Sequence, residues 1–176
     1  MNNIRTKASI FSQRVVLTLC IIFLPACNSD ICREWTIDCN VTRKPEFNSG
    51  RLSLSPLPAC SPLALEFYRN ASGLWLFLNV LSLKIPPSEN DEQLIDIEII
   101  FKEEEQPETC TVFLLDGEQR LLFPAEMTEK IIQTLLEGEN FTIQIGQASL
   151  EVISTQFNEL YGELCKIVIA EKDCPV

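Results

Sequence analysis

Apolar and polar residues alternate along much of the chain after residue 62. Successive side chains of a β-strand point to opposite faces, so a period of two predicts a strand with one face in the core. Two series show the alternation most clearly: Leu63, Leu65 and Phe67, and then Ile95, Ile97, Ile99 and Phe101. Both are predicted to be half-buried strands.

The run from Leu74 to Ile85 is the strongest core signal in the chain. Both of its faces are apolar up to Leu78, whereas Ser82 and Lys84 make one face polar further along. This pattern is typical of a central strand that emerges at one edge of its sheet. A lipid-contacting patch is the alternative interpretation of the same run.

Two hairpins are predicted from turn residues that separate apolar runs. Asp116-Gly117 lies between Val112–Leu114 and Arg120–Phe123, and Gly146-Gln147 lies between strands expected over 141–145 and 148–153. Such pairs suit the tight turns of hairpins, because those turns need a positive φ that glycine adopts easily.

Helical spacing is found in two places. Met127, Ile131 and Leu135 are four residues apart in the stretch 124–137, which starts with a proline and is followed by Gly138. Proline is common in a first helical turn and glycine just after a last one. A second helix is expected over 157–164, with Thr155 as a candidate N-cap, and Ile167 and Ile169 are expected in a final strand.

Residues 27–60 show the weakest pattern. Short strands are indicated around Trp35 and Ile37 and around Leu52 and Leu54, but three prolines and the turn signal Asn48-Ser49-Gly50 interrupt them. We therefore expect an irregular, cysteine-containing segment over 27–60 and a β-rich globular domain over 61–176. Seven to nine strands without βαβ alternation predict a mainly β or α+β fold: an antiparallel, β-sandwich-like domain with one or two short helices, stabilised by disulfides.

The N-terminal residues have the pattern of a signal peptide. Arg5, Lys7 and Arg14 precede a ten-residue apolar run over 15–24, and no acidic residue lies in this part of the chain. About 20 apolar residues are needed to span a bilayer core, so the run is too short for a permanent membrane helix.

The end of this run, Leu24-Pro25-Ala26-Cys27, resembles the lipobox of bacterial lipoproteins, although proline is unusual at its second position. The resemblance implies removal of residues 1–26 and acylation of Cys27 with fatty acids such as palmitate. Two or three acyl chains anchor a protein stably to a membrane. Asn28 in place of aspartate implies, by the same resemblance, the outer rather than the inner membrane of a bacterial envelope. An ordinary secretory signal cut near Ala26 is the alternative.

The cysteine count agrees with the lipoprotein interpretation. Of eight cysteines, Cys20 would leave with the leader and Cys27 would carry lipid. Six would remain as disulfide candidates: Cys32, Cys39, Cys60, Cys110, Cys165 and Cys174. Disulfides persist in exported proteins, and six cysteines allow fifteen pairings. Cys32–Cys39, Cys60–Cys110 and Cys165–Cys174 are one of these. Zinc is the alternative use, but no C-x₂₋₄-C pair remains and the chain has no histidine.

Charge limits the classes of partner. The part after residue 26 carries all 25 acidic residues and 11 of the 14 basic ones, a formal net charge of −14. Such a surface is repelled by nucleic acid and by anionic lipid. We therefore expect no nucleic-acid partner.

Few catalytic arrangements fit this composition. Without histidine, neither a Ser-His-Asp nor a Cys-His nucleophile can be built in its usual form. No glycine-rich phosphate loop or nucleophile-elbow motif is present, and no metal or cofactor is expected. The run Glu103–Glu105 lacks the spacing of a calcium loop. A pair of carboxylates for hydrolysis stays open, because the separation of two acids is spatial.

The stretch 123–164 is similar in outline to the invasion-associated locus B family of small exported bacterial proteins. It has an apolar segment, a turn at Gly138, a strand, and then Phe157 and a short helix. That resemblance implies a β-sandwich core and assigns no functional residue.

The sequence as a whole predicts a lipid-anchored envelope or surface protein that binds another protein and is not an enzyme. A carrier of a small apolar ligand and a carboxylate-dependent hydrolase are the alternatives. The large aromatic residues Trp35, Tyr68, Trp75 and Tyr161 are expected in the core or on a sheet face rather than in a sugar-binding platform.

Overall fold

The computed structural model describes residues 34–55, 61–81, 93–102, 106–115, 117 and 119–168, with only the backbone of 167 and 168. The chain divides after Ile31, and every described residue belongs to the unit Cys32–Val176. The leader, the lipobox and the predicted strand end at 82–85 lie outside these ranges. Among the described residues, no helix has the length and hydropathy needed to cross a membrane.

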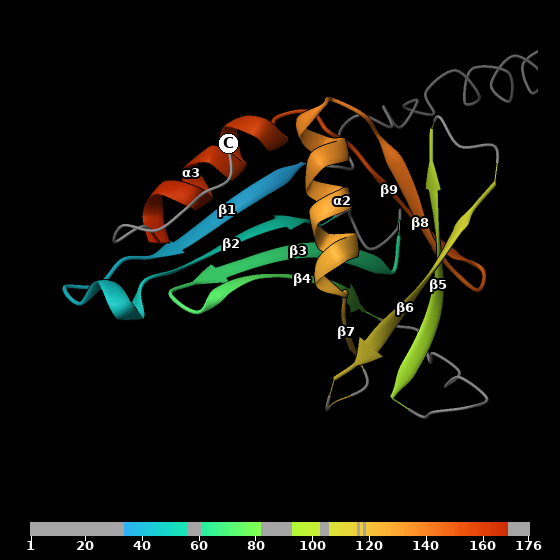
Figure 1. Cartoon of the computed structure of the whole chain (residues 1–176), viewed down its shortest axis with the longest axis horizontal. Helices are drawn as coiled ribbons and strands as arrows, with labels where there is room; N and C mark the ends of the chain where they lie inside the picture. Colours follow the sequence, from blue (N-terminus) through green and yellow to red (C-terminus); the bar gives the residue numbers. More distant parts are fainter. Residues whose placement is uncertain are drawn as a thin grey trace, which may run out of the picture. The chain divides into compact units, whose positions relative to one another are not determined.

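The described residues form a nine-stranded antiparallel sheet and two α-helices, which confirms the mainly β prediction (Figure 1). The strands lie in the order β1-β2-β3-β4-β7-β6-β5-β8-β9. Their bounds are β1 Trp35–Asn40, β2 Ser49–Leu54, β3 Leu63–Asn70, β4 Gly73–Val80, β5 Leu94–Phe101, β6 Glu108–Leu114, β7 Arg120–Leu122, β8 Phe141–Ile145 and β9 Ala148–Val152. The helices are α2 Ala125–Leu136 and α3 Phe157–Val168, and a short 3₁₀ helix, η2, spans Pro45–Phe47.

These nine strands belong to one sheet, whereas a sandwich has two. The three-residue strand β7 joins β1–β4 to the other four strands, which run in a different direction in Figure 1. The sheet bends back on itself, so that Ser61 near the start of β3 donates a hydrogen bond from Oγ to the carbonyl oxygen of Ser149 in β9, at 2.8 Å. A short linking strand allows this bend, because it holds its neighbours together over only a few residues.

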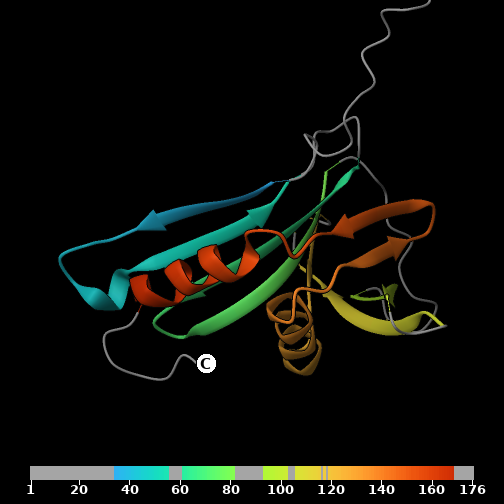
Figure 2. The ribbon, with the colours of Figure 1, turned by 90° about the horizontal axis from the view of Figure 1, so that it is seen from above.

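Helix α3 lies along the inner face of β1, β2 and β3 (Figure 2). A cluster of four aromatic residues fills the space between them: Trp35, Phe67, Phe157 and Tyr161. All four are buried. The helix comes so close to β2 that a Cβ atom added at Gly50 would lie 2.5 Å from Cδ1 of Leu164. Glycine at this position therefore allows the helix to pack against the strand.

Both predicted helices and both predicted hairpins are present. Met127, Ile131 and Leu135 form the buried face of α2, as their spacing predicted. Gly138 ends this helix with φ +85°, and the N–H groups of Gly138 and Glu139 donate to the carbonyls of Leu135 and Thr134. These are the two hydrogen bonds of a Schellman cap.

One prediction about the end of the globular part was wrong. Ile167 belongs to α3 rather than to a final strand, because the apolar helical spacing of Leu160 and Leu164 continues to it; Ile169 lies outside the described residues. The two short strands indicated around Trp35 and Ile37 and around Leu52 and Leu54 are present as β1 and β2. Both pair within the same sheet as the strands that follow residue 60.

Candidate functional site

The outer face of the sheet, opposite the aromatic core, carries an unusual group of side chains on β2, β3, β4 and β7. Antiparallel register places Ser53, Glu66, Phe77, Leu122 and Phe113 in one row across five strands. A second row contains Arg51, Tyr68 and Trp75. Residues in register across antiparallel strands have Cβ atoms about 5 Å apart, so the members of a row touch their neighbours.

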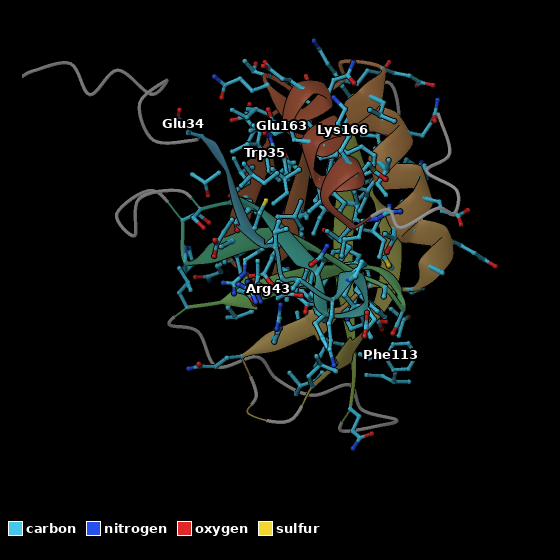
Figure 3. All side chains as sticks on the ribbon, turned by 90° about the vertical axis from the view of Figure 1, so that its left-hand side faces the viewer. Glu34, Trp35, Arg43, Phe113, Glu163 and Lys166 are labelled. Atoms are coloured by element: carbon cyan, nitrogen blue, oxygen red, sulfur yellow. The ribbon has the colours of Figure 1, made fainter. Side chains whose placement is uncertain are left out.

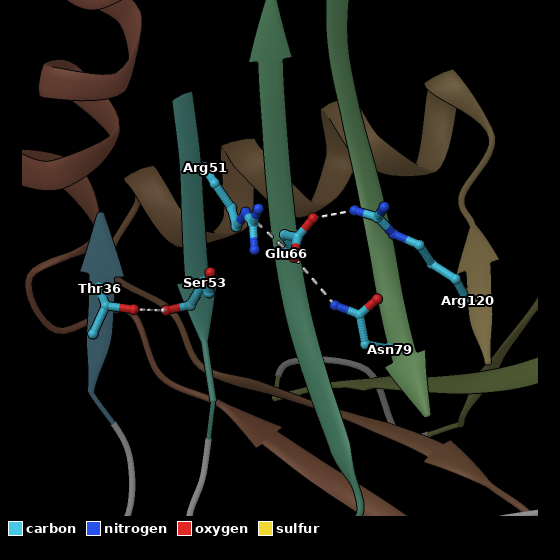
Figure 4. A network of polar contacts seen from close by, with 6 residues as sticks. All are labelled: Thr36, Arg51, Ser53, Glu66, Asn79 and Arg120. Atoms are coloured by element: carbon cyan, nitrogen blue, oxygen red, sulfur yellow. Dashed lines mark hydrogen bonds and ion pairs between the residues drawn. The ribbon is translucent and has the colours of Figure 1, made fainter. Parts of the chain in front are cut away.

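Glu66 is the centre of this group. Its side chain points outward from the middle of β3, and yet the residue is only 7% exposed. Arg120 Nη2 forms an ion pair with Oε1 of Glu66, and Asn79 Nδ2 donates to Oε2 at 3.3 Å (Figure 4). On the other side, Arg51 Nε lies 3.9 Å from the same Oε2. The carboxylate is therefore surrounded by donors from β2, β4 and β7.

Arg120 is held from two directions. Its guanidinium carbon lies 3.8 Å from the centroid of the Phe77 ring, while Nη2 reaches Glu66. A guanidinium over an aromatic ring is attracted by the negative face of the π system. Nε of Arg120 is buried and has no hydrogen-bond partner. Both arginines remain partly exposed at their side chains, so they can also meet a molecule from solvent.

Tyr68 and Trp75 add an aromatic surface beside these charges. Their ring centroids are 6.1 Å apart, and both residues are half-buried. Phe113, at the other end of the first row, is 49% exposed and is labelled in Figure 3. We call Arg51, Glu66, Tyr68, Trp75, Phe77 and Arg120 the outer patch.

The contacts of the Glu66 carboxylate limit the chemistry available at the outer patch. Hydrolysis by paired carboxylates needs a second acid near the first, but the groups that contact the Glu66 carboxylate belong to two arginines and an asparagine. Within the described ranges, no three His, Cys, Asp or Glu side chains are placed to hold a metal ion.

The structure places three of the six disulfide candidates. Cys39 on β1 is an exposed free thiol, and Cys110 on β6 is a buried one. The pairs Cys32–Cys39 and Cys60–Cys110 are therefore not formed here, and Cys32 and Cys60 lie outside the described residues, as does Cys27. Cys39 and Cys110 are on separate strands of the sheet, β1 and β6. Cys165 is not among the free thiols, and its expected partner Cys174 also lies outside.

The two free thiols differ in their surroundings. Burial, reinforced by the charges of Glu108 and Asp96, raises the pKa of Cys110 to about 11. Burial and the charges of Asp38 and Glu163 also raise the pKa of Cys39. Because the thiolate is the reactive form, both thiols are less reactive at neutral pH than an ordinary cysteine.

The sequence predicted correctly that the four large aromatic residues lie in the core or on a sheet face. It did not predict the charged residues of the outer patch. Trp35 and Tyr161 are in the core, and Tyr68 and Trp75 are on a sheet face, as expected. The available signal was Glu66 itself, a single acid that interrupts the apolar run Leu63–Phe67 of β3. Its partners Arg51 and Arg120 are far away in sequence, so only the strand order brings them together.

Comparison with protein-family models, with curated proteins and with solved structures finds no match to this chain. The similarities to the lipobox and to the invasion-associated locus B family therefore rest on sequence motifs alone.

The Glu66 carboxylate is expected to stabilise the fold. Glu66→Gln keeps the shape of the side chain but removes the charge that faces Arg51 and Arg120. Hydrogen bonds to charged groups contribute about 1.5–3 kcal/mol, so we expect a loss of about 2 kcal/mol in the free energy of unfolding, measured by urea denaturation. Glu98→Gln is the control, since Glu98 is exposed on the outer side of β5, and it should change stability by less than about 0.5 kcal/mol. Equal effects of the two variants would contradict a special role for Glu66.

The raised pKa of Cys110 predicts slow alkylation that accelerates with pH. Its thiolate fraction reaches one half only at about pH 11, whereas that of an unperturbed thiol reaches one half at about pH 8.5. In pulsed labelling followed by mass spectrometry, Cys39 should react before Cys110 at about pH 8, and both should react quickly in urea. If neither residue is labelled in urea until a reductant is added, both are in disulfides, and the prediction of two free thiols is contradicted.

Proposed function

We propose that this chain is an exported bacterial lipoprotein, anchored at Cys27 in the cell envelope, whose β domain binds another protein through the outer patch. Sequence supports the anchor through the apolar run over 15–24 and the lipobox-like motif. The composition and position of the outer patch support the binding role.

One observation carries the binding role: arginine, tyrosine and tryptophan gather on the outer face of three neighbouring strands, with Arg51, Tyr68 and Trp75 in one row. These three residue types dominate the energetics of protein interfaces. Their side chains bury large areas and lose little conformational entropy when they are already packed against one another. The Tyr68–Trp75 pair and the Arg120–Phe77 pair are packed in this way.

The charge of the outer patch indicates the chemistry of the partner. Two arginines surround a single carboxylate, so the patch carries one excess positive charge on a domain that is otherwise strongly acidic. Arg51 is the more exposed of the two and lies farther from Glu66. A carboxylate on the partner would complete its hydrogen bonds in a bidentate pair. The proposed partner therefore presents an acidic side chain among apolar ones.

The two alternative functions have less support. A carrier needs an apolar cavity between the sheet and the helix expected over 124–137, which is α2. The inward side chains of α2, Met127, Ile131 and Leu135, are instead packed into the core. A hydrolase needs two partly buried acids that face a cleft; Glu66 is the buried acid among the described residues, and its contacts are with two arginines and an asparagine. Both remain weaker proposals than protein binding.

The anchor is tested by the intact mass of the protein purified from detergent-solubilised membranes. We expect a chain that begins at Cys27 and is heavier by two or three acyl groups. A Cys27→Ser variant should lack the added mass. A chain without lipid, or one that keeps residues 1–26, would overturn the anchor.

The binding role is tested by photo-crosslinking in living cells. Benzoylphenylalanine replaces Tyr68 in the outer patch or, as a control, Gln144, a half-buried residue on the outward side of β8. We expect one discrete crosslinked species from position 68 and none from position 144. Arg51→Ala in the same chain should weaken that crosslink, because it removes the exposed guanidinium and leaves Arg120 to pair with Glu66. Similar crosslinks from both positions, or none from position 68, would contradict binding at the outer patch.

A further inference from the structure

A second surface feature lies at the turn between β1 and β2, which we call the hairpin tip (residues 41–48). Val41 is 67% exposed and Phe47 is 61% exposed, more than any other large apolar side chain among the described residues. Single exposed apolar residues are common on proteins. Here, however, the two most exposed ones lie in the same short loop.

Two basic residues stand between these apolar ones. Arg43 and Lys44 are both exposed, and Figure 3 labels Arg43 in the view from the side of the hairpin tip. Lys44 Nζ lies 5.8 Å from the centroid of the Phe47 ring. Glu46 is the one acid in the tip, which leaves one excess positive charge. Like the outer patch, the tip is therefore locally basic on a part of the chain with a formal net charge of −14.

Hydrogen bonds hold the tip in a defined shape. Asn48 Oδ1 accepts from the N–H of Thr42 at 2.7 Å, and Thr42 Oγ1 donates to the carbonyl of Lys44 at 2.7 Å. The N–H of Phe47 donates to the same carbonyl at 3.0 Å. Because the loop is already ordered, insertion of Val41 or Phe47 into an apolar medium costs little further backbone entropy.

We propose that the hairpin tip inserts Val41 and Phe47 into the surface of an anionic phospholipid bilayer, with Arg43 and Lys44 contacting lipid phosphates. Apolar side chains that enter the headgroup boundary beside basic ones are the usual composition of an interfacial membrane contact. The tip also offers anionic lipid a basic surface on an otherwise repulsive molecule.

The proposed anchor gives the tip access to the same bilayer, so this inference rests on the proposed function. The seven residue-to-residue steps from Cys27 to Glu34 span at most about 25 Å when extended. The seven steps from Glu34 to Val41, along β1, cover about 23 Å. A chain anchored at Cys27 can therefore lie with β1 along the membrane and its tip in contact with lipid.

Fluorescence quenching tests the contact. The full-length protein is purified from membranes and reconstituted into vesicles of phosphatidylethanolamine and phosphatidylglycerol with brominated acyl chains, which quench tryptophan on contact. Phe47→Trp should add fluorescence that the brominated lipid removes. Phe113→Trp is the matched control, since Phe113 is also exposed but lies far along the chain on β6, and its added fluorescence should persist.

The charges are tested in the Phe47→Trp background. Arg43→Ser and Lys44→Ser should each lower the ratio of inserted to free tips by about fivefold, and high salt should act in the same direction. Quenching that is equal in vesicles of phosphatidylethanolamine alone would overturn the role of anionic lipid. Quenching that depends on protein density rather than on brominated lipid would instead show contact between copies and overturn the proposal.

The quenching experiment distinguishes an error in the proposed membrane contact of the hairpin tip from an error in the proposed lipid anchor. If the Phe47→Trp protein floats with vesicles and carries acyl chains, but its added fluorescence is not quenched, the tip proposal is wrong and the anchor stands. If the chain carries no lipid, vesicles added to the same variant still report on the tip, because quenching of the introduced indole needs only contact with the bilayer.

Discussion

The packing of Trp35 against Phe157 is the contact on which the fold depends most. It joins the first strand of the sheet to the last described helix, with ring centroids 5.1 Å apart, and Phe67 lies against both rings. The indole N–H of Trp35 also donates to the carbonyl of Ile153 at 2.7 Å. Because a buried indole needs a hydrogen-bond acceptor, this bond fixes the direction in which the chain leaves β9 and enters α3. The same contact holds α3 against the first strand of the sheet.

The two faces of β3 are stabilised by different interactions. Its inner side packs apolar rings, whereas its outer side surrounds a buried carboxylate with arginines. Replacing a buried ion pair by apolar residues of similar size is often neutral or stabilising, so stability alone does not explain Glu66. The ion pair does hold Arg120 flat on Phe77 and leaves Arg51 available to solvent. The same interaction thus orders the residues that we propose to meet a partner.

Local elements of this fold could be predicted from sequence, but their assembly could not. The helix α2, the strands β3, β5 and β8 and the turn at Gly146 follow from periodicity and from glycine, which are local signals. The order of the strands depends on long-range pairing: β4 pairs with β7, and β5 with β8. Glu66 therefore had no visible partner in the sequence. Short alternation also indicated β1 and β2, but it did not show that these strands join the same sheet as the later ones.

The Trp35–Phe157 contact also has a consequence for the order of events during synthesis. Trp35 is made early, but the carbonyl that accepts its N–H and the ring that covers it come more than a hundred residues later. Contacts so far apart in sequence form slowly, since a long loop must close first. The core cannot be completed while the ribosome still holds α3. For a chain that is exported as we propose, the domain therefore lacks its complete core until the segment of α3 has been synthesised, which leaves time for export to begin first.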